Sequence, residues 1–407
     1  MKFFFLLIII LLSACNKTED QGNQKPLITL SSLTDGMRLQ LQGSATDADG
    51  KVDKLTIKWG DNKSNTYANN DFSQFEFNHT FTDPSTYTVT LTALDNAGDS
   101  TVQIIQVAVD FKETSLNGIR PNLFKTAADE YLIFTINLHT YQETSQNEKF
   151  NFITDVIGLM DIDFIAFQEC AQHKDAAITE GIIREDNMAL EITNRLKVKY
   201  NTDYSFVWNW AHYGWDVWEE GVAVVSKHPL LFSEDRYIST ATGTTTITSR
   251  KVIFGAYQIP EGEFHLYSAH THWRSALTDE EQNRQIENIK TMVAENESWH
   301  FGALSVVCGD FNGNPTSDYP WSEGYNTMVK DDVFQDTFFK IYPDANNTPA
   351  QAIYNTIGGD LPGRIDYIFM KKNARLQVVD SQIIFTEDII GRVSDHFGVL
   401  TKLKIGR

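Results

Sequence analysis

Two short tracts of the chain combine residue types that can hydrolyse an ester with the help of a metal ion. Gly309-Asp310-Phe311-Asn312 follows an apolar run, and Ser394-Asp395-His396 precedes one near the C-terminus. Asp395 offers an oxygen ligand for a divalent cation, and His396 offers an imidazole that transfers protons near neutral pH. Taken together, the two tracts indicate metal-assisted hydrolysis of a phosphoester.

Further polar side chains stand at the ends of strand-like runs, where a rigid sheet can fix a functional group while loops admit a substrate. Carboxylate and amide oxygens suit Mg²⁺ better than zinc. The pattern therefore predicts a Mg²⁺ site, with Mn²⁺ or Ca²⁺ as alternatives. The expected ligands are Asn137, Glu169 and Asp395, and their expected catalytic neighbours are Asp310 and Asn312.

Proton transfer needs a second group of side chains. His396 is the expected general base, and Asp366 is expected to orient and polarise it, as carboxylates do for imidazoles in hydrolytic triads. Arg364, two residues earlier, is a competing partner for Asp366. His270 is expected to bond the scissile phosphate or to protonate the leaving group, with Glu220 as its carboxylate partner.

The pattern of apolar residues divides the chain into two folded parts. Residues 26–110 contain short strands that alternate apolar and polar residues between turn clusters, which predicts a small all-β sandwich. Residues 111–130 are interpreted as a linker. In residues 131–407, strand-like runs alternate with amphipathic helices, which predicts two packed sheets flanked by helices. The helices are expected near 145–160, 186–198 and 279–295.

The N-terminal residues are typical of a secretion signal. Lys2 and the apolar run after it predict a signal peptide over residues 1–14, too short to span a membrane stably. Leu12-Ser13-Ala14-Cys15 is similar to a bacterial lipobox, so Cys15 is the expected lipidation site and residues 15–25 a polar tether. We expect a monomer in a bacterial cell envelope, lipid-anchored to the outer membrane and facing the periplasm or the surface. The alternative is an ordinary signal peptide with an incidental cysteine.

Composition limits the possible partners. The 407 residues include 34 Lys+Arg and 54 Asp+Glu, which gives a formal net charge of −20. An acidic surface repels polyanions and argues against tight, non-specific binding to nucleic acid, although a local basic cleft would be hidden in the average. Cys170 and Cys308 are expected to be small buried hydrophobes, with a disulfide as the alternative. The cysteine and histidine spacing does not favour zinc.

The motifs of the second part, taken in order, resemble those of the endonuclease/exonuclease/phosphatase superfamily. They are Asn137, Gln168-Glu169, residues 221–229, His270, residues 309–312, residues 364–367 and residues 394–396. The resemblance implies an α+β four-layer αββα sandwich, Mg²⁺-dependent cleavage of phosphoesters and the roles given above. It also implies that Arg250 contacts the phosphate.

The first part resembles the polycystic-kidney-disease (PKD) type of immunoglobulin-like module. The resemblance rests on Trp59-Gly60-Asp61, His79-Thr80-Phe81 and Asp95-Asn96-x-Gly98. It implies a small all-β immunoglobulin-like sandwich, and such modules usually serve as spacers or weak binders. No catalytic constellation is present in this part of the sequence.

Two departures from the superfamily pattern leave choices open. The usual Thr-His-Leu appears here as Ala269-His270-Thr271-His272-Trp273. Counting along the strand favours His270 as the catalytic residue, whereas the local match of Thr271-His272-Trp273 favours His272. If His270 is catalytic, His272 is a candidate for substrate binding. The tryptophan-rich tract 208–220 resembles secreted bacterial branches of the superfamily, and Trp218 is a candidate substrate contact, with a core role as the alternative. We expect a small phosphomonoester or phosphodiester substrate, such as a sugar phosphate or a lipid headgroup. The alternatives are a nuclease acting on DNA or RNA and an inactive binding protein.

Overall fold

The computed structural model describes residues 22–274, 276, 278–317, 321–346, 354–358 and 363–406. The chain divides into two compact units, Met1–Lys112 and Glu113–Arg407. The expected signal peptide, Cys15 and most of the tether lie outside the described residues. Within the ranges given, none of the helices combines the length and the apolar character needed to cross a membrane.

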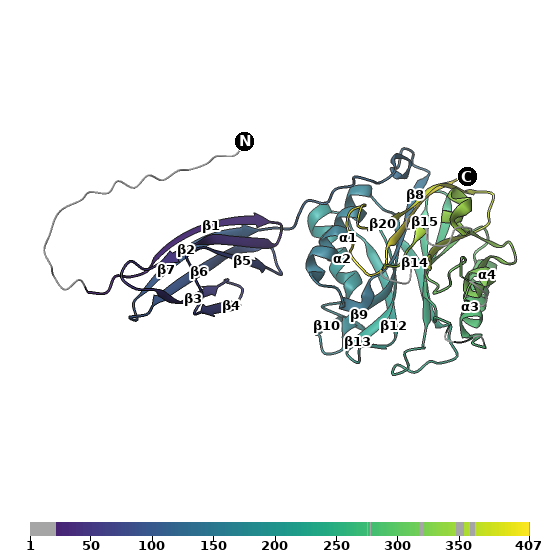
Figure 1. Ribbon diagram of the computed structural model, residues 1–407. Helices are drawn as coiled ribbons and strands as arrows, with labels where there is room; N and C mark the ends of the chain where they lie inside the picture. Colours follow the sequence, from purple (N-terminus) through teal and green to yellow (C-terminus); the bar gives the residue numbers. More distant parts are fainter. Residues whose placement is uncertain are drawn as a thin grey trace. The chain divides into compact units, whose positions relative to one another are not determined.

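The N-terminal unit is an all-β immunoglobulin-like sandwich (Figure 1). A three-stranded sheet, in the order β1-β2-β5, faces a four-stranded sheet, in the order β4-β3-β6-β7. Alternate side chains point into the space between them, among them Leu39, Leu91 and Trp59, each at most 1% exposed. The strands are β1 (Leu27–Asp35), β2 (Arg38–Thr46), β3 (Val52–Lys58), β4 (Ser64–Ala68), β5 (Phe75–Thr80), β6 (Ser85–Asp95) and β7 (Ser100–Val109).

The C-terminal unit contains two six-stranded mixed sheets, with strand orders β12-β13-β9-β8-β21-β20 and β14-β15-β16-β17-β19-β18. The first sheet consists of β8 (Glu130–Asn137), β9 (Phe164–His173), β12 (Ser205–Gly214), β13 (Trp218–Ser226), β20 (Leu376–Ile384) and β21 (Gly398–Ile405). The second consists of β14 (Leu230–Tyr237), β15 (Lys251–Ile259), β16 (Gly262–His270), β17 (Leu304–Asp310), β18 (Phe334–Asp336) and β19 (Asp366–Lys371). The longer helices are α1 (Gln146–Met160), α2 (Met188–Tyr200) and α3 (Glu281–Trp299), and the shorter ones are α4 (Glu323–Val329) and α5 (Thr337–Ile341).

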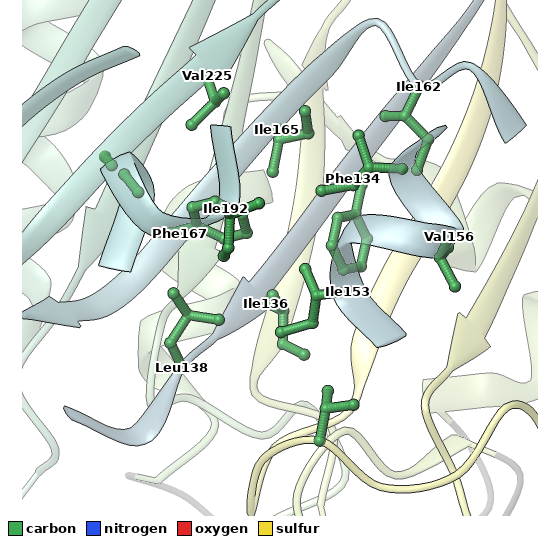
Figure 2. Close-up of a cluster of buried hydrophobic side chains, with 14 of the residues drawn as sticks. Phe134, Ile136, Leu138, Ile153, Val156, Ile162, Ile165, Phe167, Ile192 and Val225 are labelled. Atoms are coloured by element: carbon green, nitrogen blue, oxygen red, sulfur yellow. The ribbon is translucent and has the colours of Figure 1, made fainter. Parts of the chain in front are cut away.

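Three apolar layers hold this unit together. Helices α1 and α2 cover the outer face of the first sheet, where Ile153 and Ile192 meet Phe134 and Phe167 (Figure 2). A second cluster joins the inner faces of the two sheets, and a third joins the second sheet to α3 and α4. The order helix, sheet, sheet, helix is the expected four-layer αββα sandwich, so the predicted fold class is confirmed. Each sheet is buried on both faces, which explains the nearly continuous apolar runs of its central strands.

Strand register brings the predicted site residues to one edge of the two sheets. The parallel pairs β8–β9 and β16–β17 place Asn137 beside Gln168 and His270 beside Asp310. The antiparallel pair β17–β19 sets Asp366 opposite Asp310. Gly309 makes the close strand approach possible, because a Cβ there would lie 1.9 Å from the carbonyl oxygen of Ala269.

Candidate active site

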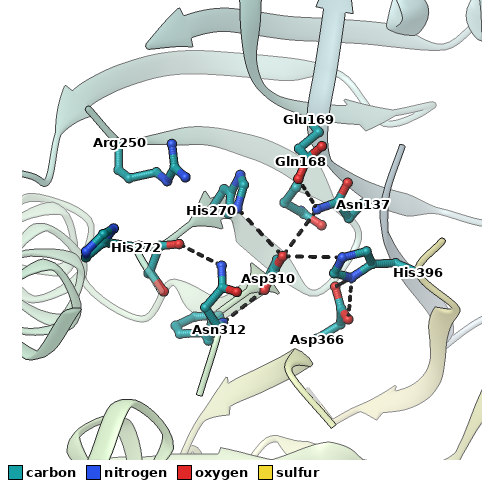
Figure 3. Close-up of polar contacts among 12 residues, drawn as sticks. Asn137, Gln168, Glu169, Arg250, His270, His272, Asp310, Asn312, Asp366 and His396 are labelled. Atoms are coloured by element: carbon teal, nitrogen blue, oxygen red, sulfur yellow. Dashed lines mark hydrogen bonds and ion pairs between the residues drawn. The ribbon is translucent and has the colours of Figure 1, made fainter. Parts of the chain in front are cut away.

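Two carboxylates from different sheets meet at the centre of the site (Figure 3). Asn137 Nδ2 donates to Glu169 Oε1 at 2.9 Å and to Asp310 Oδ2 at 3.2 Å. The Asn137 side-chain oxygen accepts the backbone N–H of His139 at 3.0 Å. The amide nitrogen of Asn137 thus ties the two carboxylates together, and its side-chain oxygen keeps a second lone pair, so its role as a metal ligand stays a prediction.

The central acids are held in an unfavourable electrostatic environment. Burial and the neighbouring Glu220 raise the pKa of Glu169 to about 8. Burial and the neighbouring Asp366 raise the pKa of Asp310 to about 7. Crowded acids of this kind fit a hard divalent cation, which would relieve both the repulsion and the desolvation. Glu169 and Asp310, together with His270, present their ligand atoms within 4.8 Å of one another.

His396 has the carboxylate partner that the sequence predicted. Its Nδ1 lies 3.0 Å from Asp366 Oδ2, and its Nε2 lies 3.8 Å from Asp310 Oδ2. Burial lowers the pKa of His396, but the adjacent Asp366 carboxylate outweighs burial and raises the pKa well above its ordinary value. Arg364 pairs with Asp336 at 2.6 Å, so the competing pairing of Asp366 with Arg364 does not form.

His270, and not His272, reaches the central acids. His270 Nε2 lies 3.6 Å from Asp310 Oδ2, and burial together with the positive charge of Arg250 lowers its pKa well below the ordinary value. His272 turns away, and its Nε2 lies 3.2 Å from Asp279. Its peptide group is held by two glutamine side chains of α3. His272 therefore holds the loop in place, and its expected contact with the substrate stays a prediction.

Glu220 has a different partner from the one expected. Its Oε1 lies 3.1 Å from His212 Nε2, and its Oε2 accepts the hydroxyl of Thr140 at 2.8 Å. His212 and Glu220 are direct cross-strand neighbours in the β12–β13 hairpin, which places both side chains on one face. Burial raises the pKa of Glu220, but the hydrogen bond from His212 outweighs it and lowers the pKa. The predicted pairing of Glu220 with His270 is therefore wrong.

Arg250 supplies positive charge beside the acids. The residue is 3% exposed, its Nη1 donates to the carbonyl oxygen of Ile247 at 2.6 Å, and its buried Nε has no hydrogen-bond partner among the described residues. It precedes β15 directly, so the sheet fixes its backbone. A buried guanidinium with an unused N–H is suited to bind a phosphoryl oxygen.

Asn312 is fixed by the loop that follows β17. Its backbone N–H donates to Asp310 Oδ1 at 2.9 Å, and its side-chain Nδ2 donates to the carbonyl oxygen of Thr271 at 2.9 Å. The backbone of Asn312 is left-handed, with a φ of 48°. Asparagine tolerates this conformation better than most residues. The side-chain oxygen therefore stays available beside Asp310.

Two other predicted residues lie elsewhere. Asp395 is grouped with His139 and Glu143, and its Oδ1 lies 3.4 Å from His139 Nδ1. The expected ligand set of Glu169 and Asp395 is therefore not assembled as one group. Trp218 stacks on Tyr141 with ring centroids 4.7 Å apart and packs against the core of the first sheet, as its alternative core role implies, and its substrate contact stays a prediction.

A cavity of about 520 Å³ opens onto these groups. Its described lining combines the acids and histidines with apolar side chains that sequence reasoning missed: Trp215, Trp273, Ile247, Ile357 and Ile365. Trp215 belongs to the tryptophan-rich tract, and Trp273 follows the two histidines. In the sequence, only the position of these two tryptophans in loops next to strand ends indicated that they could line the cavity.

Comparison with known proteins agrees with the geometry. Residues 135–396 match the profile of the Endonuclease/Exonuclease/phosphatase family, and residues 23–109 match that of the PKD domain. The chain is similar to the solved structure of an endonuclease/exonuclease/phosphatase family protein from Leptotrichia buccalis C-1013-b, with 26% identity and a TM-score of 0.58 over 68% of this chain and 100% of that one.

The catalytic domain of human Nocturnin with a bound sulfate anion shares 17% identity and a TM-score of 0.50, over 70% of this chain and 100% of that one, and shows the fold alone. None of the curated proteins compared with the chain matches it. The family profile covers more than half of the sequence and includes every central group of the site. The chain belongs to the endonuclease/exonuclease/phosphatase family, whose members are typically phosphoesterases and nucleases, and it carries an N-terminal PKD domain.

Proposed function

We propose that the C-terminal unit hydrolyses small phosphoesters with the help of a divalent cation, for which Mg²⁺ is the best fit and Mn²⁺ or Ca²⁺ the alternatives. The observation that carries the proposal is the convergence of Glu169, Asp310, His396 and Arg250 on one cavity. Oxygen donors without a thiolate favour a hard cation. Such a cation, when bound, would neutralise charge on the phosphoryl oxygens and lower the pKa of nearby acids.

The protein's own side chains provide proton transfer. His396 Nε2 faces Asp310 across the cavity, and its Nδ1 is bonded to Asp366. Asp366 fixes the ring, and a bound cation would offset the charge of the acids that raise the pKa of His396, so that the unprotonated imidazole would accept a proton from the attacking water. The proton is then held at Nε2, where Asp310 stabilises the imidazolium.

Arg250 and His270 are placed to bind the phosphoryl group. Arg250 lines the cavity, and its guanidinium can donate to a phosphoryl oxygen there. His270 is neutral over the physiological range because burial and Arg250 lower its pKa. A neutral imidazole can donate one N–H to the phosphate without adding a second positive charge. Glu220 and His212 hold the Arg250 side of the cavity in place.

The cavity favours a small substrate over a polynucleotide. Its volume is about 520 Å³, within the range of small-molecule sites. Arg250 is the only lysine or arginine among the described residues that line it. A protein that tracks a nucleic-acid backbone neutralises several phosphates, which needs several cations. The formal net charge of −20 adds to this preference.

The test measures hydrolysis by the chain without residues 1–24, with and without Mg²⁺. Sugar phosphates, inositol phosphates, sphingomyelin and plasmid DNA are compared in parallel, and EDTA is used to remove the metal. We expect Mg²⁺-dependent release from a small substrate, and its loss in His396→Ala. His300→Ala is the matched control, because His300 pairs with Glu263 at the start of β16, the strand end away from the site.

Each outcome decides between the candidate functions. DNA cleavage that disappears in His396→Ala, with the small substrates untouched, would replace the proposal by a nuclease. Equal activity in the presence and absence of EDTA would show that the hydrolysis does not need a metal ion. Failure of every substrate, with no heat of Mg²⁺ binding in calorimetry, would leave the inactive binding protein as the remaining interpretation.

We also propose that the protein is a lipid-anchored monomer of a bacterial cell envelope. The support is the sequence around Cys15 alone. Metabolic labelling with a fatty acid should mark the wild-type chain and leave Cys15→Ser unlabelled. Labelling of both chains, or of neither, would contradict the anchor.

A further inference from the structure

Three apolar side chains at the mouth of the catalytic cavity are exposed without a folding reason. Trp215, Ile247 and Trp273 are 53%, 56% and 41% exposed, and all three line the cavity. They come from three separate loops: the β12–β13 connection, the segment before β15 and the segment after β16. Large apolar side chains gathered around one opening are characteristic of a binding site. We call these three residues the apolar rim.

The backbone at Trp215 strengthens this interpretation. Trp215 has a φ of 46° and the next residue, Asp216, has a φ of 62°, so both are left-handed. Such positions in tight hairpins favour glycine, asparagine and aspartate, and a bulky residue is an outlier there. The ring of Trp215 contributes little to the core, since more than half of the residue is exposed. A strained and exposed tryptophan beside a reactive centre is better explained by ligand binding than by folding.

Trp273, the second tryptophan of the apolar rim, is held next to Arg250, which is proposed to bind the phosphate. The guanidinium carbon of Arg250 lies 5.6 Å from the centre of the Trp273 ring. This contact positions the indole close to the place where Arg250 would hold a phosphoryl oxygen. The indole of Trp273 therefore lies beside the expected position of the phosphate, where it could contact the organic part of the substrate.

We infer that the apolar rim is a specificity subsite for a ring directly attached to, or one bond removed from, the phosphate, so that the substrate is a ring-bearing small phosphoester. This inference deepens the proposed function and rests on it. A sugar ring or an aromatic ring presents a flat, partly apolar face that an indole can cover. A polynucleotide fits less well, because Arg250 is the only lysine or arginine among the described lining residues.

The test uses phosphonates, which bind without being hydrolysed. Methyl-, phenyl- and cyclohexylphosphonate share one anionic head and differ only in the group beside it. Their affinities for the purified protein in Mg²⁺ buffer are measured by calorimetry. We expect phenyl- or cyclohexylphosphonate to bind about tenfold more tightly than methylphosphonate, the size of one good aromatic contact. A preference for phenyl alone indicates an aromatic ring in the substrate, and a preference for both rings indicates a sugar-like ring.

Two variants assign the preference to the rim. Trp215→Ala and Trp273→Ala should each reduce the ring preference several-fold while the affinity for methylphosphonate changes less than twofold. Trp299→Ala is the matched control, because Trp299 is 82% exposed at the end of α3 and does not line the cavity. It should keep the full preference.

The inference is overturned if the three phosphonates bind equally, if none binds, or if the preference survives both rim substitutions. Its failure is separate from failure of the proposed function. A protein that hydrolyses phosphoesters without ring preference disproves the subsite and keeps the hydrolase. A protein that prefers ring phosphonates but hydrolyses nothing keeps the subsite and disproves the hydrolase.

Discussion

Strand β9 is preceded by one acid, Asp163, and contains another, Glu169, and the fold surrounds the two acids with opposite charges. Asp163, directly before the strand, lies 2.9 Å from Lys125, 3.2 Å from Lys227 and 3.1 Å from His228. Burial raises its pKa, but the bond from His228 and the two lysines outweigh burial and lower it. Glu169, within the strand, faces other acids, and no lysine or arginine of the described chain forms an ion pair with it.

The comparison distinguishes an acid that has a structural role, Asp163, from one that has a proposed functional role, Glu169. An acid surrounded by cations is neutralised by the fold and needs nothing else. An acid surrounded by acids is stable only with a proton or a bound cation. The raised pKa of Glu169, about 8, and its left-handed backbone, with a φ of 44°, both mark it as a strained functional position.

The largest expected effect is on catalysis. Glu169→Gln should lower kcat/KM by at least about a hundredfold, because it removes the charge that would hold the cation, and loss of even an outer partner of a metal ligand costs 10–100-fold. Steady-state rates at saturating Mg²⁺ measure the change. The same measurement on Asp163→Asn should show less than a twofold effect. Comparable losses in both variants would show that the two acids do not differ in function.

The second effect is on stability, and here the substitution of Asp163 is expected to cost more than that of Glu169. Asp163→Asn leaves two lysines and a histidine without their buried partner, so the free energy of unfolding should fall by about 3 kcal/mol. Glu169→Gln removes a repelled charge and should keep or raise the stability of the metal-free protein. Urea unfolding in EDTA at pH 8 compares the variants. A larger loss of unfolding free energy in Glu169→Gln than in Asp163→Asn would show that Glu169, and not Asp163, is the structural acid.

The smallest expected effect is on the pH dependence of stability. In the metal-free folded protein, Glu169 and Asp310 keep their protons up to about pH 8 and 7, whereas carboxyl groups of the unfolded chain lose theirs near pH 4. The folded state therefore binds more protons in this window, and its stability falls as the pH rises. We expect the free energy of unfolding to decrease steadily between pH 5 and 8 in EDTA.

Glu169 and Asp163 again differ in this experiment. Glu169→Gln should flatten the decline between pH 5 and 8. Asp163, with its lowered pKa, contributes stability that is lost only as the pH falls below about 4, so Asp163→Asn should leave the decline unchanged. A stability that rises with pH in EDTA between pH 5 and 8 would contradict the crowding of acids.

Much of the site could be predicted because sheets impose simple rules. Polar residues that end neighbouring strands share an edge, which brings His270 and Asp310 together, and Asp366 follows from strand pairing. The helices were likewise visible as amphipathic runs, and α1, α2 and α3 begin within two residues of the expected positions.

The errors arose where the register or a loop decides the direction of a side chain. The partner of Glu220 depends on the β12–β13 register, which shifts at a bulge between Trp210 and His212. Trp218 was chosen over Trp215 because position in the tract does not reveal which indole leaves the sheet. Asp395 and His396 are neighbours, but they lie in a bend, where the sequence does not reveal the direction of each side chain, and His396 is the one that faces Asp310.

The position of β21 in the sheet also sets when the proposed site becomes complete during synthesis. This strand lies between β8 and β20, and β8 is the first strand of the unit to leave the ribosome. His396 is delivered by the segment that leads into β21, so a growing chain has its acids long before it has its base. The proposed turnover would begin only after β21 has joined the sheet, so an incomplete chain would lack the proposed base.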